Sequence, residues 1–206
     1  NYGASKVVSI PNINKGDSQS AAKVFSDLSS DSSVIIFSNT YTAKMIAPRL
    51  SVKIEAALLT NVISVSEGSN IQIKRKAFST KAIETTKSNT EKTILCIAPN
   101  SFGLIETGGS CTIEKMDFSE SGSLSFDSQE TASGKISISE AEIVVSGGRG
   151  LKGPENWGMI EEMADILGAA TACSKPVSDM GWRPHSEHVG QTGKPVASNL
   201  YIAVGI

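Results

Sequence analysis

The spacing of hydrophobic residues changes along the chain, and each change predicts a different element of secondary structure. Residues 6–10 and 34–37 are short apolar runs that predict strands. Between them, apolar residues recur at helical spacing and predict one face of a helix: Ala21, Val24, Phe25 and Leu28. Residues 42–54 predict a second helix that bends or begins at Pro48, because proline interrupts helical hydrogen bonding. This alternation is typical of an α/β domain.

After residue 60 the pattern changes to alternating strands. The predicted strands are residues 62–65, 71–76, 93–98 and 112–118. Lys74, Arg75 and Lys76 lie in the second of these, and we interpret them as a solvated sheet edge that discourages further strand pairing.

Residues 119–139 are rich in Ser, Gly and Glu, and they predict a surface excursion and a hinge. We therefore predict a domain boundary near Gly134. It divides the chain into an N-terminal domain of residues 1–133 and a second domain of residues 134–206.

The last third of the chain begins with a strand, a glycine turn and a helix. Residues 141–146 predict a buried strand, and residues 147–150 contain three glycines. Pro154 suits a first helical turn, and Gly168 suits a helix end. The residues that recur at helical spacing between them are Trp157, Ile160, Ala164 and Leu167. Such a unit can present backbone N–H groups to a phosphate, although most glycine turns of this kind bind nothing.

Two more strands are predicted in this part, at residues 169–173 and 200–206. Ser174, Lys175 and Pro176 follow the first of them, at the position where open α/β sheets tend to bind ligands. A Gly-containing segment, VGQTGK, fills residues 189–194 before the final strand.

These segments resemble the flavin-binding domain of the electron transfer flavoprotein alpha-subunit family. The resemblance is carried by VVSGGRGLK, PENW, ACSKPVSDMGW, VGQTGK and YIAVGI, which occur in order over residues 143–206. It implies an N-terminal α/β domain with a mostly parallel sheet, followed by the first part of a Rossmann-like, doubly wound FAD-binding domain. It also implies that the family's first strand and helix, and its last nucleotide-binding strands, lie outside this chain.

The resemblance assigns a role in FAD binding to seven positions. Arg149 corresponds to an arginine that lies against the isoalloxazine ring, and Ser174 corresponds to a cofactor contact. Lys175 replaces an arginine whose charge favours the reduced, anionic flavin, and an ammonium cannot stack as a guanidinium can. The loop that wraps the flavin corresponds to Val189, Gly190, Gln191 and Thr192, with the Thr192 hydroxyl near flavin N5.

The resemblance also implies a function. The expected protein is an electron carrier without an acid–base catalytic residue, in which FAD carries the redox chemistry. It would pair with a beta subunit, accept electrons from flavin dehydrogenases such as the acyl-CoA dehydrogenases of fatty-acid β-oxidation, and pass them to a quinone reductase. Its location would be the bacterial cytoplasm or the mitochondrial matrix. Two alternatives remain: a nucleotide-dependent dehydrogenase on the same sheet, and a non-redox interaction subunit that has lost FAD.

Composition and net charge argue against several other classes of function. A net charge of −2 and a pI near 5.8 argue against a nucleic-acid partner, and no apolar run reaches the ~20 residues of a membrane span.

Cys96, Cys111 and Cys173 lie too far apart for a metal or redox motif. His185 and His188 lack further ligands nearby, so we interpret them as solvent-facing loop residues. We interpret both tryptophans, Trp157 and Trp182, as packing residues.

Overall fold

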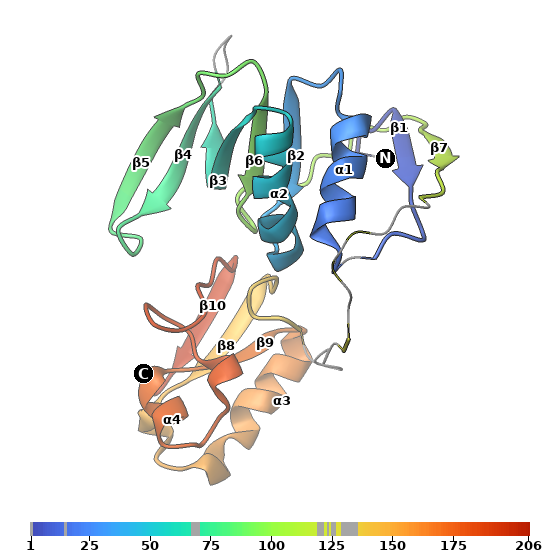
Figure 1. Ribbon diagram of the computed structural model, residues 1–206. Coiled ribbons are helices and arrows are strands. Elements are labelled where there is room, and N and C mark those ends of the chain that lie inside the picture. The colour runs from blue at the N-terminus through green and yellow to red at the C-terminus, as the bar shows by residue number, and fades with distance from the viewer. Residues whose placement is uncertain are drawn as a thin grey trace. The chain divides into compact units, whose positions relative to one another are not determined.

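The computed structural model describes residues 2–14, 16–66, 71–118, 122, 124, 127–128 and 136–206. The chain forms two compact units, Asn1–Glu130 and Thr131–Ile206 (Figure 1). The predicted boundary at Gly134 lies outside the described residues, so the domain limits stay a prediction.

The first unit is built on a five-stranded sheet with the strand order β2-β6-β3-β4-β5. The strands are β2 (Val34–Ser38), β3 (Ala57–Val65), β4 (Gln72–Ala77), β5 (Ala82–Lys87) and β6 (Thr93–Ile97). Strands β2, β6 and β3 are parallel, whereas β4 and β5 extend the sheet as an antiparallel pair. The α/β class is confirmed, with a mixed sheet.

Two helices, α1 (Ser18–Leu28) and α2 (Tyr41–Lys53), lie side by side over one face of this sheet (Figure 1). Their small and aliphatic side chains pack onto the buried side chains of β6, which gives the core cluster Ala21, Ala22, Ile46, Ala47, Leu50, Ala56, Ile94 and Cys96. Pro48 lies inside α2, so the prediction that the helix begins there is wrong. A separate parallel pair joins β1 (Lys6–Ser9) to β7 (Thr112–Lys115).

The interpretation of residues 74–76 as a sheet edge is wrong, because β4 pairs with β3 on one side and with β5 on the other. The positive charge of Arg75 on this interior strand is paired with a carboxylate on the neighbouring strand β5. Arg75 donates from Nε and Nη2 to the two carboxylate oxygens of Glu84, at 3.0 and 2.9 Å. These hydrogen bonds lower the pKa of Glu84.

The turn between β4 and β5 has an unusual backbone. Phe78, Ser79 and Thr80 all have positive φ angles, and that of Thr80 is 68°. This left-handed conformation is the one that glycine adopts most readily, so three residues with side chains hold a backbone here that favours glycine.

The second unit is built on a parallel sheet with the order β10-β8-β9. Its elements are β8 (Ile143–Gly147), the 3₁₀ turns η1 (Arg149–Leu151) and η2 (Pro154–Asn156), α3 (Gly158–Leu167), β9 (Ala170–Cys173), α4 (Lys175–Asp179), η3 (His185–Glu187) and β10 (Leu200–Val204). Gly168 has a φ angle of 60° and ends α3, as predicted.

Buried side chains cover both faces of this sheet. On the α3 face they are Val145, Leu151, Trp157, Ile160, Ala164, Cys173 and Val177, and on the other face Ile138, Ala141, Val144, Ala170 and Ala172. The packing roles of Trp157 and Trp182 are confirmed, since Trp157 is 3% exposed and Trp182 packs against the same cluster. Leu167 is 38% exposed and lies outside this core.

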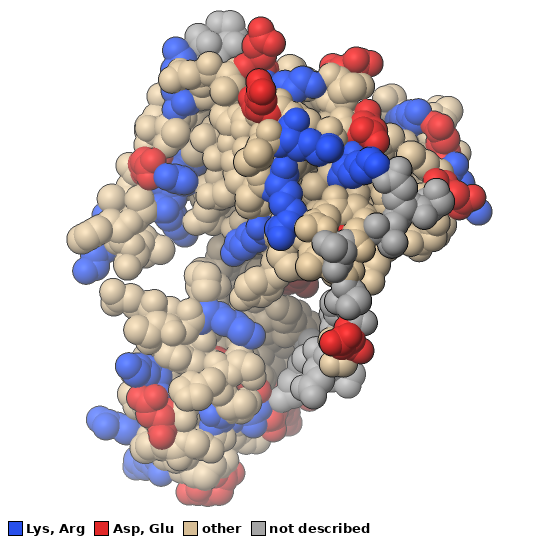
Figure 2. Space-filling model, viewed as in Figure 1, with Lys and Arg blue, Asp and Glu red and all other residues tan. Residues whose placement is uncertain are grey.

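Charges of both signs share the surface. Figure 2 shows Lys and Arg side chains gathered over the face of the first unit that carries α2, with Asp and Glu side chains close by. Helix α2 itself contains the basic residues Lys44, Arg49 and Lys53. Within the described residues, no helix is long and apolar enough to cross a membrane.

The N-cap of α1 leads to a pH-dependent prediction. Asp17 is 5% exposed and accepts hydrogen bonds from the Ser20 hydroxyl and from the backbone N–H groups of Gln19, Ser20 and Gly122. These hydrogen bonds, led by that of the Ser20 hydroxyl, lower the pKa of Asp17. Its stabilising contribution is therefore present above the unfolded-state pKa and is lost as the pH falls through the folded-state pKa.

We expect Asp17→Ala to lower the free energy of unfolding by about 1 kcal/mol at neutral pH, because the cap is lost. Asp17→Asn is the matched control, since asparagine caps helices but does not titrate. Urea unfolding of parent and control should show a stability difference that narrows between about pH 6 and about pH 3. A difference that stays constant over this range would contradict the assigned role of the carboxylate.

Candidate cofactor site

The carboxyl ends of three parallel strands meet at one edge of the second sheet. From β8 the chain passes through α3 to β9 on one side of β8, whereas β10 pairs with the opposite side of β8. The end of β8 is therefore a topological switch point, which is where open α/β sheets bind their ligands. All seven predicted cofactor residues lie on the segments that leave this edge.

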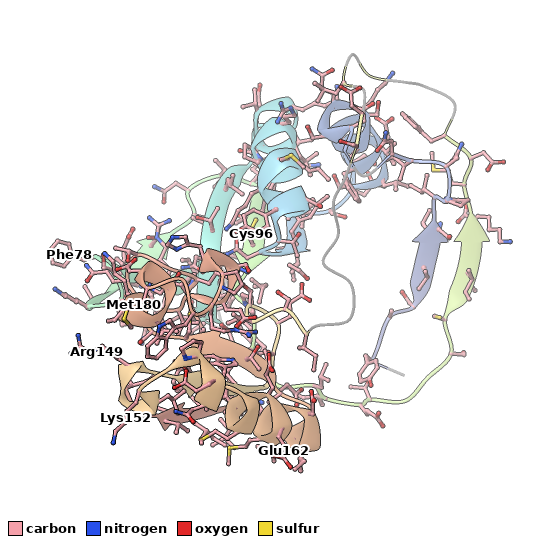
Figure 3. All side chains as sticks on the ribbon, turned by 90° about the horizontal axis from the view of Figure 1, so that it is seen from below. Phe78, Cys96, Arg149, Lys152, Glu162 and Met180 are labelled. Carbon is pink, nitrogen blue, oxygen red and sulfur yellow. The ribbon has the colours of Figure 1, made fainter. Side chains whose placement is uncertain are left out.

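The glycine turn after β8 packs against the end of β10. Gly148 N–H donates to the Val204 carbonyl at 2.8 Å, and Gly150 N–H donates to the Gly205 carbonyl at 2.7 Å. A Cβ atom on Gly148 would lie 2.2 Å from the Gly205 carbonyl oxygen, so no side chain fits there. The turn leaves Arg149 exposed, and Figure 3 shows Arg149 and Lys152 projecting outward from it.

Ser174 and Lys175 leave the end of β9 next to this turn. Ser174 N–H donates to the Gly147 carbonyl at 3.1 Å, which ties the residue to the end of β8. Ser174 is half-buried at the N-cap of α4, but its hydroxyl makes no capping hydrogen bond. Lys175 is exposed. Within the described part of the chain, neither Lys175 nor Arg149 has an ion-pair partner, so both positive charges are available to a ligand.

The segment after β9 returns to the same edge as a narrow loop. Val189 N–H donates to the Cys173 carbonyl at 3.1 Å, and Lys194 N–H donates to the His188 carbonyl at 2.9 Å. Gly190 has a φ angle of 126°. The backbone N–H groups of Gln191 and Thr192, at the exposed tip, make no hydrogen bond to any described residue. The loop therefore offers two free donors and the Thr192 side chain.

One of the two histidines, His185, faces solvent as predicted, whereas His188 does not. His188 is 6% exposed instead of facing solvent, because its backbone forms a β-bridge with Cys173 at the end of β9. His185 is exposed, and its Nδ1 atom lies 3.0 Å from the Ser178 hydroxyl. No group of His, Cys, Asp and Glu within the described residues could hold a metal ion.

Sequence reasoning missed a set of charged residues beside the loop. Arg183 donates from Nε and Nη2 to the two carboxylate oxygens of Glu187, each at 2.7 Å, and its Nη1 atom lies 3.1 Å from a Glu161 oxygen. The hydrogen bond to Glu187 is the main reason that the pKa of Arg183 is raised. The guanidinium also lies 5.2 Å from the centre of the Trp157 ring. In the sequence, only the i, i+4 spacing of Arg183 and Glu187 could have indicated this ion pair.

The groups at this edge fit FAD. Two unpaired cations and two free N–H groups suit a ligand that carries a pyrophosphate and gains negative charge on reduction. Ser146 adds a hydroxyl that is fully buried near the end of β8 and has no hydrogen-bond partner among the described residues. The Cys173 thiol is buried near this edge, and burial raises its pKa to about 11, which disfavours the thiolate.

Two family models match the chain. The model described as "Electron transfer flavoprotein domain" matches residues 1–121, and the model described as "Electron transfer flavoprotein FAD-binding domain" matches residues 137–206. The second match contains all seven candidate residues.

Curated relatives agree with the family models. The chain is 34% identical to electron transfer flavoprotein subunit alpha of Bacillus subtilis (strain 168), over 100% of this chain and 66% of that protein. It is 36% identical to the protein of the same name from Paracoccus denitrificans, over 87% of this chain and 58% of that protein. The probable mitochondrial alpha subunit of Caenorhabditis elegans is 35% identical, over 78% of this chain and 49% of that protein.

The chain thus spans between half and two thirds of the length of these relatives. The model that matches residues 1–121 covers more than half of the chain, and the relatives carry one common name. The chain therefore belongs to the electron transfer flavoprotein alpha-subunit family, and residues 137–206 carry the family's FAD-binding domain.

Proposed function

We propose that the complete protein is the FAD-binding alpha subunit of a heterodimeric electron transfer flavoprotein. It accepts electrons from flavin dehydrogenases, such as the acyl-CoA dehydrogenases of fatty-acid β-oxidation, and passes them to a quinone reductase. It works in the bacterial cytoplasm or, in a eukaryote, in the mitochondrial matrix. The observation that carries the proposal is the gathering of Arg149, Ser174 and residues 189–192 at the switch point of the second sheet.

FAD supplies the electron-accepting chemistry, and the protein binds and orients the cofactor. Arg149 and Lys175 would hold positive charge beside the bound cofactor, and such charge would favour the reduced, anionic form. The N–H groups of Gln191 and Thr192, which make no hydrogen bond to any described residue, would donate to the cofactor. Ser174 adds a hydroxyl from the end of β9. None of these groups has to transfer a proton to a substrate.

The alternative of a nucleotide-dependent dehydrogenase has little support at this edge. Such an enzyme needs an acid or a base that reaches its substrate. His188 is buried, His185 is engaged with Ser178, and the Cys173 thiol stays protonated. A non-redox subunit that has lost FAD would retain this fold, but the positive charges at the sheet edge would then have no ligand.

The proposal is tested first by assembly. We expect the complete protein, co-expressed with a beta subunit, to purify as a one-to-one heterodimer with the visible absorption of bound flavin. Size-exclusion chromatography with light scattering gives the stoichiometry, and the absorption spectrum gives the cofactor content. A colourless heterodimer would favour the non-redox alternative, and a monomer that carries electrons alone would contradict the assignment.

Arg149 is the residue on which the electrostatic role rests. In the flavin-loaded heterodimer, we expect Arg149→Ala to lower the midpoint potential by roughly tens of millivolts and to weaken FAD retention, because a charge that favours the reduced state is removed. Spectroelectrochemical titration measures the potential. The fold should remain intact, because the side chain is exposed.

Lys175→Arg is the matched comparison, since it keeps the charge and adds a planar group that can stack. It should preserve or raise the potential. If Arg149→Ala leaves the potential and the FAD affinity unchanged, the role assigned to this edge is wrong.

A further inference from the structure

Arg183 lies at the centre of an ion-pair network beside the candidate cofactor loop; Arg183 and Glu187 are largely buried, whereas the Glu161 side chain is 46% exposed. Its side chain is 16% exposed, and that of Glu187 is 9% exposed. The pair is bidentate, with both distances at 2.7 Å. Glu161 of α3 provides a second carboxylate, and the Trp157 ring provides an aromatic face. One guanidinium therefore joins two segments of the second unit: α3 with its N-cap residue Trp157, and the turn η3 that carries Glu187.

Both segments lead to the candidate cofactor site. Glu187 is followed by His188 and Val189, whose backbone groups attach the loop to the end of β9 and close it through Lys194. Trp157 packs against the other side of the site: a Cβ atom on Gly147 would lie 2.6 Å from its ring, directly before the glycine turn. The network thus spans the space between the glycine turn and the root of the loop.

The chemistry of this network favours a geometric role over a purely stabilising one. Removing two charges from water costs much of what their attraction returns, so a buried ion pair adds little net stability over well-packed apolar residues. A bidentate guanidinium does, however, fix the positions of its partners, because its donors form a rigid planar fork. The exposed tip of the loop is closed by hydrogen bonds from Gly193 N–H to the Gly190 carbonyl and from Gly190 N–H to the Lys194 carbonyl, at 3.1 and 3.3 Å, but no ion pair among the described residues holds it to the rest of the unit.

We propose that Arg183 is a positioning residue for the cofactor, which holds the root of the 188–194 loop against α3 and Trp157 so that the loop donors face FAD. This inference rests on the proposed function, since it assumes that FAD binds at this edge. It concerns a residue that touches the loop's root and not the ligand.

The test compares Arg183→Met and Arg183→Lys with the parent in the complete protein, assembled with its beta subunit. The methionine variant leaves Glu187 without its bidentate partner, and the lysine variant keeps the charge without the fork. We expect Arg183→Met to raise the dissociation constant for FAD by about tenfold or more, because breaking a buried pair is costly. Arg183→Lys should give an intermediate increase. Fluorescence titration with FAD measures both constants.

Two further readouts separate positioning from a merely structural role. Hydrogen–deuterium exchange in the FAD-free protein should be faster in residues 188–194 of both variants. Flavin that still binds should show a changed visible circular dichroism spectrum and a shifted midpoint potential. If the variants lose only thermal stability, while bound flavin keeps the parental spectrum and potential, the positioning role is refuted. If Arg183→Met does not fold, the same measurements on Arg183→Lys decide between the two roles.

The chain contains a matched control in the other unit. Arg75 and Glu84 form the same bidentate pair, at 3.0 and 2.9 Å, and no candidate cofactor residue lies in that unit. Arg75→Met should leave the FAD constant, the loop exchange and the flavin spectrum unchanged; equal changes in both methionine variants would overturn the proposal. If the parent protein binds no FAD, the proposed function itself is refuted. If the parent binds FAD and the Arg183 variants bind it as the parent does, only this inference is refuted.

Discussion

The candidate site depends on one constraint, the close contact between the glycine turn after β8 and the chain that leaves β10. Gly148 and Gly150 donate hydrogen bonds to Val204 and Gly205 with almost no space between the two backbones. The contact is geometrically feasible because β8 pairs in parallel with β10, so that both strands end at the same edge. Any side chain on Gly148 would force these segments apart and displace Arg149 with them.

Electrostatics divides the charged residues of the second unit into two sets. Arg183 is paired with Glu187 and Glu161 and is shielded from solvent, so its charge is already balanced. Arg149 and Lys175 are exposed and have no ion-pair partner within the described residues, so their charge can respond to a ligand. We therefore propose that the first set shapes the site and the second tunes the potential of the cofactor.

Local sequence patterns predicted the elements whose structure depends on their own residues. The strand, glycine turn and helix of residues 141–168 were predicted, because hydrophobic period and glycine act over a few positions, although Pro154 begins a 3₁₀ turn and α3 begins only at Gly158. Strand β5 was missed because its residues, AIETTK, have weak hydrophobic alternation. The interior position of β4 was mistaken for an edge because the partner that balances Arg75, Glu84, lies on that missed strand.

The remaining errors concern contacts between residues distant in sequence. His188 is buried because it bridges to Cys173, and no local pattern reports such a pairing. The Arg183 network needs Glu161, which α3 brings from an earlier part of the chain. The seven candidate cofactor residues were identified through resemblance to a family, and the structure adds that they lie on segments leaving a single sheet edge; their roles in binding stay predictions.

The central claim, that FAD binds at the carboxyl edge of the second sheet, is tested most directly by photolabelling. An azido-substituted FAD would be bound to the complete heterodimer, activated by light and located by mass spectrometry of proteolytic peptides. The account predicts labelled peptides that contain residues 147–152 and 188–194, with labelling suppressed by excess FAD. Labelling confined to peptides of residues 1–121 would contradict it.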